Sequence, residues 1–315
     1  MLYITLFLLS LILTYLIRQY AEKKAILDIP NDRSSHITPI PRGGGLGIVV
    51  LFFTTLIYFK SSIDTPLFYA LLSTIPIAII SLIDDIITIS SRLRILVQSL
   101  SAILALYALG GVNNIDFIYF ELHGIWLNII AFIAIIWLTN LYNFLDGIDG
   151  YAGSQAITVG LGIFLFFNSF LGLVIVAISL GFLVFNWHKA SIFMGDVGST
   201  TLGFIFAIFI LYYREGGDIF LSMVLLSLFW FDATITLIRK FRNREKLTQA
   251  HKKHAYQRLV QSGWSHSKVT LFALAFNSIF LFLLYIVPNI STVFVINILS
   301  LYIILKFIDR KRAFK

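Results

Sequence analysis

The sequence of 315 residues contains no cysteine, which excludes disulfide bonds and thiol catalysis and leaves the redox compartment open. We also expect no cleavable signal peptide, because the first apolar run, Leu2 to Ile17, has neither a basic residue ahead of it nor a small-residue cleavage site. We expect this run to be a spanning helix instead. One half of the chain does not repeat the other, so a proton-coupled secondary transporter built from inverted repeats is the less favoured class.

Apolar residues dominate the composition. They make up 58% of the chain, and the mean hydropathy is +0.89, far outside the usual range of a soluble domain. Runs close to the roughly 20 residues that cross a bilayer recur from end to end. We expect one all-α, polytopic membrane domain covering residues 1–315. Its eleven expected spans are 2–19, 45–59, 66–83, 95–111, 125–142, 152–168, 171–187, 199–213, 218–238, 269–287 and 290–308.

The placement of charge predicts the orientation. Of the 24 Lys and Arg residues, all but Lys60 and Arg214 fall on the side of the C-terminus. The positive-inside rule makes that side cytoplasmic and puts the N-terminus outside. This bias, with attraction to anionic lipid, explains the net charge of +8 without nucleic acid. The loops predicted to lie on this side and to form the active site are 20–44, 84–94, 143–151, 188–198 and 239–268.

Acidic residues gather at the predicted cytoplasmic ends of the spans. Carboxylates at such depth are costly and tend to be functional, and on a face rich in Lys and Arg they indicate metal chemistry. Asp84 and Asp85 are adjacent and repel each other, so we expect metal binding or proton transfer there. The full set is Asp84, Asp85, Asp146, Asp149, Asp196 and Asp232.

The segment 140–153, Asn-Leu-Tyr-Asn-Phe-Leu-Asp-Gly-Ile-Asp-Gly-Tyr-Ala-Gly, is the strongest candidate for a site. Asp146 and Asp149 are three residues apart, so on a helical turn their carboxylates share one face. Three glycines leave bare backbone that a ligand can approach closely. These features suit a hydrated divalent cation that carries a phosphate. The plain alternative is a polar turn between two spanning helices.

Two further loops carry smaller signals. Arg42 stands before the glycine-rich stretch 43–47, whose N–H groups at the start of a span can cradle an anion. This stretch fails as a nucleotide fingerprint, because no strand precedes it. Asp196, between two glycines, is a metal candidate, with a helix cap as the alternative. Asn186 has an amide suited to a base edge or a sugar hydroxyl.

The longest predicted cytoplasmic loop is rich in histidine and basic residues. His251 and His254 share a face if this part is helical. Two histidines at that spacing can bind a metal, but zinc normally takes more ligands. Beside Lys252, Lys253 and Arg258, we favour a loop that binds phosphate and sugar.

Together these motifs resemble one family. Asp84-Asp85, Asn143-Phe-Leu-Asp-Gly-Ile-Asp-Gly150, Phe193-Met-Gly-Asp-Val-Gly-Ser199 and the histidine loop follow in the order typical of the polyprenyl-phosphate N-acetylhexosamine-1-phosphate transferases. That family includes the phospho-MurNAc-pentapeptide translocase and the WecA-type enzymes. The resemblance implies transfer of a sugar-1-phosphate from a UDP-N-acetylhexosamine to undecaprenyl phosphate, releasing UMP, with Mg²⁺ or Mn²⁺. It implies a multi-pass enzyme with its active site on the cytoplasmic face, and a homodimer is one assembly to be tested.

The resemblance also implies roles for individual residues. Asp84 resembles the group that deprotonates the lipid phosphate, or else a covalent nucleophile, and Asp85 its support. Asp196 resembles the direct metal ligand, with Asp85 and Asp149 as further candidates, and Asp149 is also a catalytic candidate. The resemblance implies substrate contacts at Asn143, Asp146, Asn186, His251 and His254. The charges of their own loops add Arg42 and Arg258 as further substrate-contact candidates.

Departures from the family pattern bear on the donor. The loop 251–259 lacks the triple histidine of the translocases, which argues against MurNAc-pentapeptide, and it differs from the His-Ile-His-His form of WecA-type enzymes. The wording His254-Ala-Tyr-Gln-Arg258 is closer to the branch that initiates O-antigen, a part of lipopolysaccharide, with 6-deoxy donors such as UDP-FucNAc or UDP-QuiNAc. We expect such a donor first and UDP-GlcNAc second. The CDP-alcohol phosphotransferases are disfavoured, because the arginine of their Asp-Gly motif is missing after Asp146.

Overall fold

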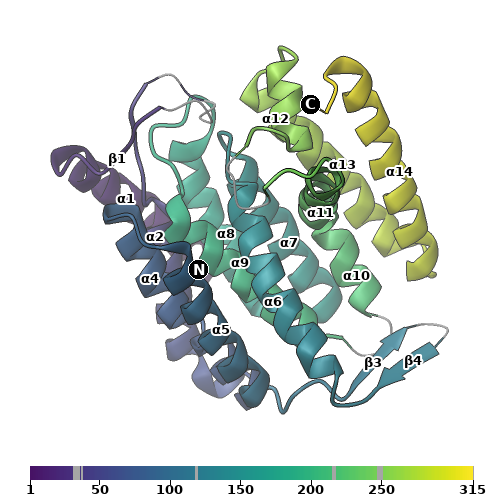
Figure 1. Cartoon of the computed structure of the whole chain (residues 1–315). Coiled ribbons are helices and arrows are strands. Elements are labelled where there is room, and N and C mark those ends of the chain that lie inside the picture. The colour runs from purple at the N-terminus through teal and green to yellow at the C-terminus, as the bar shows by residue number, and fades with distance from the viewer. Residues whose placement is uncertain (31–35, 37, 118–119, 215–217, 247–250, 315) are drawn as a thin grey trace.

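The computed structural model describes residues 1–30, 36, 38–117, 120–214, 218–246 and 251–314. Parts of the predicted active-site loops 20–44 and 239–268 therefore lie outside the described residues. Within the described part, the chain is a bundle of helices with two short antiparallel hairpins, β1 with β2 and β3 with β4 (Figure 1). The elements are α1 Leu2–Lys23, β1 Leu27–Asp28, β2 Ile40–Pro41, α2 Gly45–Tyr58, the 3₁₀ turn Lys60–Ser62, α3 Thr65–Leu72, α4 Ile75–Ile86, α5 Ser91–Ala108, β3 Asn114–Phe117, β4 Phe120–His123, α6 Leu127–Phe144, α7 Tyr151–Phe167, α8 Phe170–Asn186, α9 Gly195–Tyr212, α10 Asp218–Leu225, α11 Ser227–Arg242, α12 Ala255–Gln261, α13 His266–Ile286 and α14 Ile290–Lys311.

Several helices begin where a side chain can accept a hydrogen bond from an otherwise unpaired backbone N–H. Ser90 accepts from the N–H of Leu93 at the start of α5. Ser265 does the same for α13 and Asn289 for α14. Each such cap stabilises its helix by about 1 kcal/mol and fixes the residue at which the helix starts.

The predicted all-α, polytopic class is confirmed. Each of the eleven predicted spans coincides with a helix or with two successive helices. Among the described residues, six helices are long and apolar enough to cross a membrane, and a bent pair raises this to seven. Three shorter apolar helices, α2, α7 and α8, coincide with further predicted spans. The count of eleven and the orientation stay predictions.

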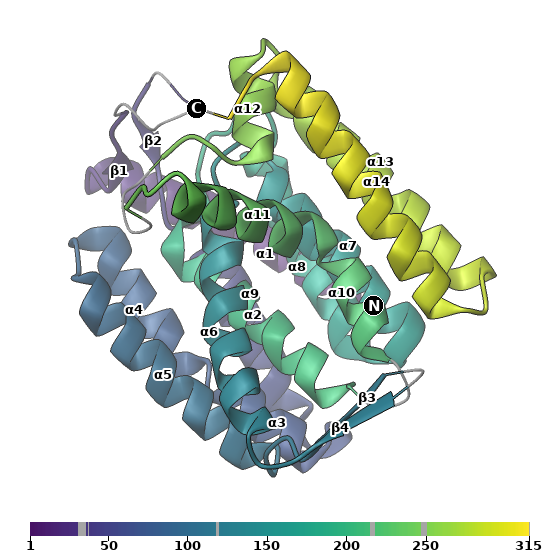
Figure 2. The ribbon, with the colours of Figure 1, turned by 45° about the vertical axis from the view of Figure 1, so that its right-hand side comes forward.

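Two predicted spans are interrupted. Pro76 lies in the first turn of α4 and separates it from α3. α10 and α11 meet at an angle of 80°, so α11 lies across the bundle rather than along it (Figure 2). Carbonyls freed by such a break need partners in an apolar medium. The side chain of Gln155 donates to the carbonyl of Leu225 at 2.8 Å, and the indole of Trp230 to that of Met223 at 2.8 Å.

α9 is the central helix. Most of its residues are buried, including Phe204, Phe206 and Phe209. Near its start it crosses the start of α2 so closely that a Cβ on Gly45 would overlap Gly198. Only backbone can pass at this distance, so the two helix ends are fixed relative to each other.

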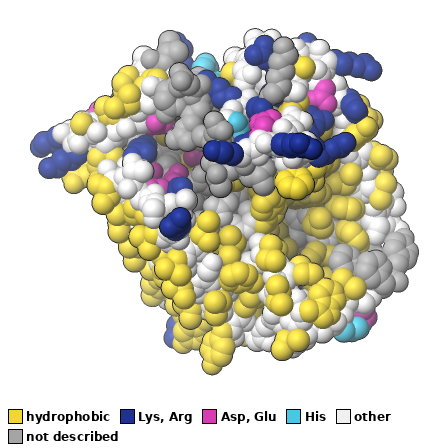
Figure 3. Space-filling view, in the orientation of Figure 1, with side chains coloured by type: hydrophobic (Ala, Val, Ile, Leu, Met, Phe, Trp, Pro, Cys, Tyr) yellow, Lys and Arg dark blue, Asp and Glu magenta, His cyan; other side chains and the backbone are white. Residues whose placement is uncertain are grey.

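The surface divides into an apolar belt and a charged end. Lys and Arg side chains gather at the end that carries α12 and β1, and hydrophobic side chains cover much of the flank below (Figure 3). The β3–β4 hairpin lies at the opposite end (Figure 1). The acidic motif loops open at the charged end.

Candidate active site

Asp84 and Asp196 meet at Arg94. Asp84 lies in the last turn of α4, Arg94 in the first turns of α5 and Asp196 in the first turn of α9. Nη1 of Arg94 donates to Oδ2 of Asp84 at 2.8 Å and to Oδ2 of Asp196 at 3.0 Å. The other oxygen of Asp84 accepts from the N–H of Ile89 at 2.6 Å. Two carboxylates from motifs more than 100 positions apart in the sequence therefore face one guanidinium nitrogen.

Asp85 points to a different partner from its neighbour Asp84. Its two carboxylate oxygens accept from the N–H groups of Asp196, at 2.9 Å, and Val197, at 3.0 Å. It thus caps α9 from the side, where the positive end of the helix dipole favours a negative charge. Gly195, with φ of +75°, leaves room for this carboxylate, because a Cβ there would overlap it. Only 3% of Asp85 is exposed, so it acts on the site by positioning Asp196.

Asn143 and Asp146 extend the cluster from the other side. The amide of Asn143 donates to Oγ of Ser199 at 3.2 Å and faces the carboxylate of Asp196. Burial, followed by the negative charges of Asp196 and Asp85, raises the pKa of Asp146 to about 8. Negative charge is therefore in excess here, and a cation is the group that relieves it.

The expectation that Asp146 and Asp149 share one helical face is wrong. Both lie in the turn between α6 and α7, and Asp149 is directed away toward two histidines. The glycines of this turn face protein rather than open space. A Cβ on Gly147 would overlap the hydroxyl of Tyr256, and one on Gly150 would press on Trp187. Their lack of a side chain serves close packing.

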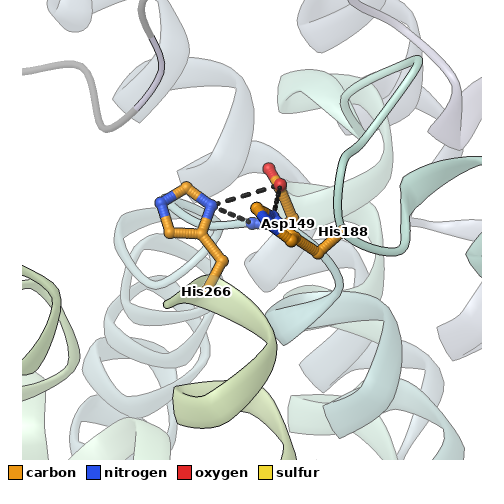
Figure 4. A group of neighbouring side chains, drawn as sticks. All are labelled: Asp149, His188 and His266. Atoms are coloured by element: carbon orange, nitrogen blue, oxygen red, sulfur yellow. Dashed lines mark hydrogen bonds and ion pairs between the residues drawn. The ribbon is translucent and has the colours of Figure 1, made fainter. Parts of the chain in front are cut away.

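Asp149, His188 and His266 form a compact group (Figure 4). Oδ2 of Asp149 lies 2.8 Å from Nδ1 of His188 and 3.2 Å from Nδ1 of His266. Burial acts to raise the pKa of Asp149, but the hydrogen bonds with His266 and His188 outweigh it, and the pKa is lowered below its usual value. Asp149 is therefore ionised, and its carboxylate already contacts both histidines.

This is the one group of three acidic or histidine side chains in the described chain whose ligand atoms all lie within 4.8 Å of one another. The predicted ligands Asp85, Asp149 and Asp196 do not form such a group, because the first two are engaged elsewhere. Sequence reasoning missed His188 and His266 as site residues. Their signal was the distribution of histidine, since five of the six lie in the predicted cytoplasmic segments and only His123 lies on the other side.

Asn186 and the glycine-rich stretch 43–47 form hydrogen bonds that hold neighbouring loops in place. The side chain of Asn186 accepts from the N–H of Gly150 at 3.0 Å and donates to the carbonyl of Ile192 at 3.0 Å. The N–H groups of Gly44 and Gly45 donate to the carbonyls of Phe193 and Met194 at 2.9 and 2.8 Å. The expected anion cradle is therefore wrong for these two groups, which bind the Phe-Met-Gly-Asp segment instead.

Arg42 is a cation beside the carboxylates. It lies close enough to Asp85 for its charge to act on that group. Its buried Nε has no hydrogen-bond partner among the described residues. A buried polar atom without a partner is costly, so Arg42 is suited to receive an anionic ligand.

The histidine loop is not helical at His251 and His254, because α12 begins at Ala255. The two rings nevertheless lie together, with centroids 4.9 Å apart. Burial and the nearby His254 lower the pKa of His251 to about 4, so its ring is neutral at pH 7. Asp232 accepts from the N–H of Ala255 at 2.8 Å and thereby holds α12 beneath this pair.

Arg258 is the predicted substrate contact whose environment differs most from the expectation. Only 2% of it is exposed, and its two terminal nitrogens each lie 2.7 Å from Oδ1 of Asp309 in α14. Arg239 binds both oxygens of the same carboxylate. These contacts tie α11, α12 and α14 together, which favours a structural role for Arg258.

Comparison with known proteins agrees with this arrangement. The family model for glycosyl transferase family 4 matches residues 67–214, which carry every acidic residue of the Asp84–Asp196 cluster. This stretch of the chain is similar to that family. The match ends before the histidine loop, so residues 251–258 lie outside it.

Other proteins are similar to this chain over most of its length. A Bacillus subtilis protein named probable undecaprenyl-phosphate N-acetylglucosaminyl 1-phosphate transferase is 28% identical, over 81% of this chain and 75% of its own. A Thermotoga maritima undecaprenyl-phosphate alpha-N-acetylglucosaminyl 1-phosphate transferase is 27% identical, over 86% of each chain. A phospho-N-acetylmuramoyl-pentapeptide-transferase from Kosmotoga olearia is 25% identical, over 76% of this chain and 80% of its own.

Proposed function

We propose that the protein transfers an N-acetylhexosamine-1-phosphate from a UDP-sugar to a polyprenyl phosphate, releasing UMP, at the cytoplasmic face of a bacterial inner membrane. The observation that carries the proposal is the meeting of Asp84 and Asp196 at Arg94, beside Asp146. Reaction between two phosphates needs charge neutralisation and in-line positioning, and this cluster offers both carboxylates and guanidinium groups. The relatives described above are named as phosphosugar transferases. The Bacillus subtilis protein aligns with about four-fifths of this chain.

Asp84 is the residue we assign to the acceptor phosphate. A phosphate monoester is largely ionised near neutral pH, since its second pKa is about 6. The carboxylate therefore removes the last proton and holds the acceptor in line, with its own position fixed by Arg94 and Ile89. An oxygen of the lipid phosphate attacks the phosphorus next to the sugar. The bond between the two phosphates of the donor breaks, and its electron pair leaves with UMP.

Arginine side chains supply positive charge around this centre. Arg94 balances Asp84 and Asp196 before substrate binds, and Nε of Arg42 is a buried donor that has no partner among the described residues. A planar guanidinium binds phosphate oxygens in pairs. We assign Arg42 to the donor diphosphate and Arg94 to the alignment of the two carboxylates.

The oxygen donors of this cluster fit a hard divalent cation such as Mg²⁺ or Mn²⁺. Asp196 would hold it, together with Asp84 or Asp146, whose raised pKa reflects the uncompensated charge. When bound, the cation supplies charge neutralisation at the phosphates that exchange the bond. Asn143 orients the Asp196 carboxylate from the nucleotide side.

The donor sugar is the finer part of the proposal. The histidine-loop wording at 254–258 supports a 6-deoxy N-acetylhexosamine and a role in starting O-antigen, whereas the names of the first two relatives support N-acetylglucosamine. We keep the 6-deoxy donor as the first candidate, because that loop lies outside the region matched to the family as a whole.

A donor screen tests both levels of the proposal. Purified full-length protein in detergent, given undecaprenyl phosphate and Mg²⁺, should release UMP from at least one UDP-N-acetylhexosamine, and chelation should stop the release. UMP release from UDP-GlcNAc alone would reject the 6-deoxy donor. Failure with UDP-GlcNAc, UDP-FucNAc and UDP-QuiNAc alike would reject the transferase assignment. Phosphosugar left on the protein without lipid acceptor would replace direct attack by a covalent intermediate.

A further inference from the structure

We propose that Asp149, His188 and His266 bind a late first-row transition-metal ion of the Zn²⁺ class, separate from the oxygen-ligated cation at Asp196. The three side chains come from the α6–α7 turn, the α8–α9 loop and the first residue of α13. Figure 4 shows both imidazole rings converging on the carboxylate of Asp149. This inference depends on the local geometry and stands apart from the transferase activity.

The distances match a coordination sphere that is nearly closed. Zinc binds histidine nitrogen and carboxylate oxygen at about 2.0–2.2 Å, so tetrahedral ligands lie about 3.4 Å apart. Here the oxygen–nitrogen distances are 2.8 and 3.2 Å, and all three ligand atoms lie within 4.8 Å of one another. To reach the tetrahedral spacing, the two oxygen–nitrogen contacts would lengthen by about 0.6 and 0.2 Å.

Hydrogen bonds already bring the three ligand atoms together. Nδ1 of His188 and Nδ1 of His266 both face Oδ2 of Asp149, and the backbone N–H of Asp149 lies 3.4 Å from Nδ1 of His266. A metal ion would take the place of the ring protons in these contacts, because the unprotonated imidazole is the form that binds metals.

Surrounding contacts hold the ligands in place and leave one side open. The N–H of Ala190 donates to Oδ2 of Asp149 at 3.3 Å, and the hydroxyl of Thr270 donates to its carbonyl at 3.0 Å. His266 and Asp149 are buried, whereas His188 is exposed at the charged end of the molecule. A metal can therefore enter from solvent beside His188 and keep a water or an anionic ligand in its open position.

The ligand set distinguishes this site from the Asp84–Asp196 cluster. Two imidazole nitrogens with one carboxylate suit Zn²⁺, Co²⁺ or Fe²⁺, whereas Mg²⁺ prefers an all-oxygen, octahedral shell. An ion here would fasten the start of α13 to the turn that carries Asp146. Its occupancy would thus stiffen the nucleotide side of the carboxylate cluster.

Cobalt substitution tests the site directly. The purified full-length protein in detergent, stripped with chelator and held in excess Mg²⁺, should bind one equivalent of Co²⁺ with the visible absorption of a nitrogen-ligated ion, and Zn²⁺ should displace it. His188→Ala and His266→Ala should each weaken this binding at least about tenfold. The matched control His123→Ala, at an exposed histidine on the other side of the molecule, should leave it unchanged.

Two results would overturn the proposal. One is a wild-type protein that binds no Co²⁺ in excess Mg²⁺, which would leave the group as a hydrogen-bonded pair of rings. The other is binding that persists in His188→Ala but disappears in His251→Ala, which would place the ion at the histidine loop. A thermal shift separates misfolding from lost ligation, because Zn²⁺ should raise the Tm of the wild type. The exposed His188→Ala variant should keep the metal-free Tm and lose only this increase.

Discussion

The carboxylate of Asp85 in α4 accepts a hydrogen bond of 2.9 Å from the backbone N–H of Asp196 in α9. This contact joins the last turn of one helix to the first turn of another. It sets the distance between the two acidic motifs, because the side chain of Asp196 then returns to Arg94 and Asp84. One buried carboxylate thus orients a second one that is open to ligands.

We predict that Asp85→Asn and Asp196→Asn have different signatures. Asp196→Asn should abolish UMP release while the Tm changes little, because it removes a ligand. Asp85→Asn turns an N–H toward the start of α9 in place of an acceptor, so it should lower stability by about 1–3 kcal/mol and activity with it. Thermal unfolding beside UMP release measures both. Equal Tm values for the two variants would argue against a positioning role for Asp85.

For Arg94 we predict that charge alone is insufficient. Its Nη1 serves two carboxylates, and a lysine has no planar fork to reproduce this geometry. Both Arg94→Lys and Arg94→Ala should therefore reduce kcat, by an expected factor of about 10² for alanine. Arg92→Ala on the same helix is the control and should retain activity. A fully active Arg94→Lys protein would reduce the role of Arg94 to general electrostatics.

The raised pKa of Asp146 predicts a pH-dependent stability. A carboxyl group with a folded pKa of about 8 and an ordinary pKa of 3.8 binds its proton more strongly in the folded state. In metal-free protein, this contribution is complete below about pH 4 and is lost as the pH rises toward 8. The Tm should fall over that window, and Mg²⁺ should restore it most near pH 8.

Asp146→Asn should flatten this profile, because an amide does not titrate. Asp149 does not disturb this measurement. Its pKa is lowered in the folded state, so its contribution to stability is lost only at acidic pH, below the ordinary pKa of an aspartate. An unchanged slope in Asp146→Asn would locate the titration in another group.

Gly147 and Tyr256 offer a double-mutant test of packing. A Cβ at position 147 would overlap the Tyr256 hydroxyl, which donates to the carbonyl of Phe144 at 3.1 Å. Gly147→Ala should therefore cost about 1–3 kcal/mol of stability. In Tyr256→Phe the obstructing oxygen is absent, so the same glycine change should cost less. Additive effects in thermal unfolding would show that the two residues do not interact.

Sequence patterns predicted the helices far better than the directions of the acidic side chains. Each hydrophobic run predicted as a span coincides with one helix or with two successive helices, because a bilayer requires apolar length and little else. Motif order predicted that Asp84, Asn143 and Asp196 belong together. It gave no account of the contacts of Asp85 and Asp149, since adjacent or nearly adjacent residues on a turn can point to different partners. His188 and His266 depend on contacts between residues more than 35 positions apart, which no local pattern encodes.

The break between α10 and α11 was also not predicted, because it lies within a continuous apolar run. Hydropathy records composition and not direction, so residues 218–238 were expected to form one span. The partner that makes the 80° bend tolerable is Gln155, from a helix far away in sequence. Arg258 was likewise predicted from the basic character of its loop, and its partner Asp309 lies 51 positions further on.

The close passage of Gly45 and Gly198 makes the start of α9 more rigid than the histidine loop. At this crossing, backbone abuts backbone, so the Phe-Met-Gly-Asp segment has no freedom to adapt to a new substrate. In the described part of the histidine loop, side chains make the contacts that hold it, among them those of Asp232, the Arg258–Asp309 pair and the Tyr256 hydroxyl. Exchanging residues 251–261 between relatives should therefore redirect sugar choice while the bond-forming end stays as it is. Changes in donor specificity among relatives would then be confined to the histidine loop.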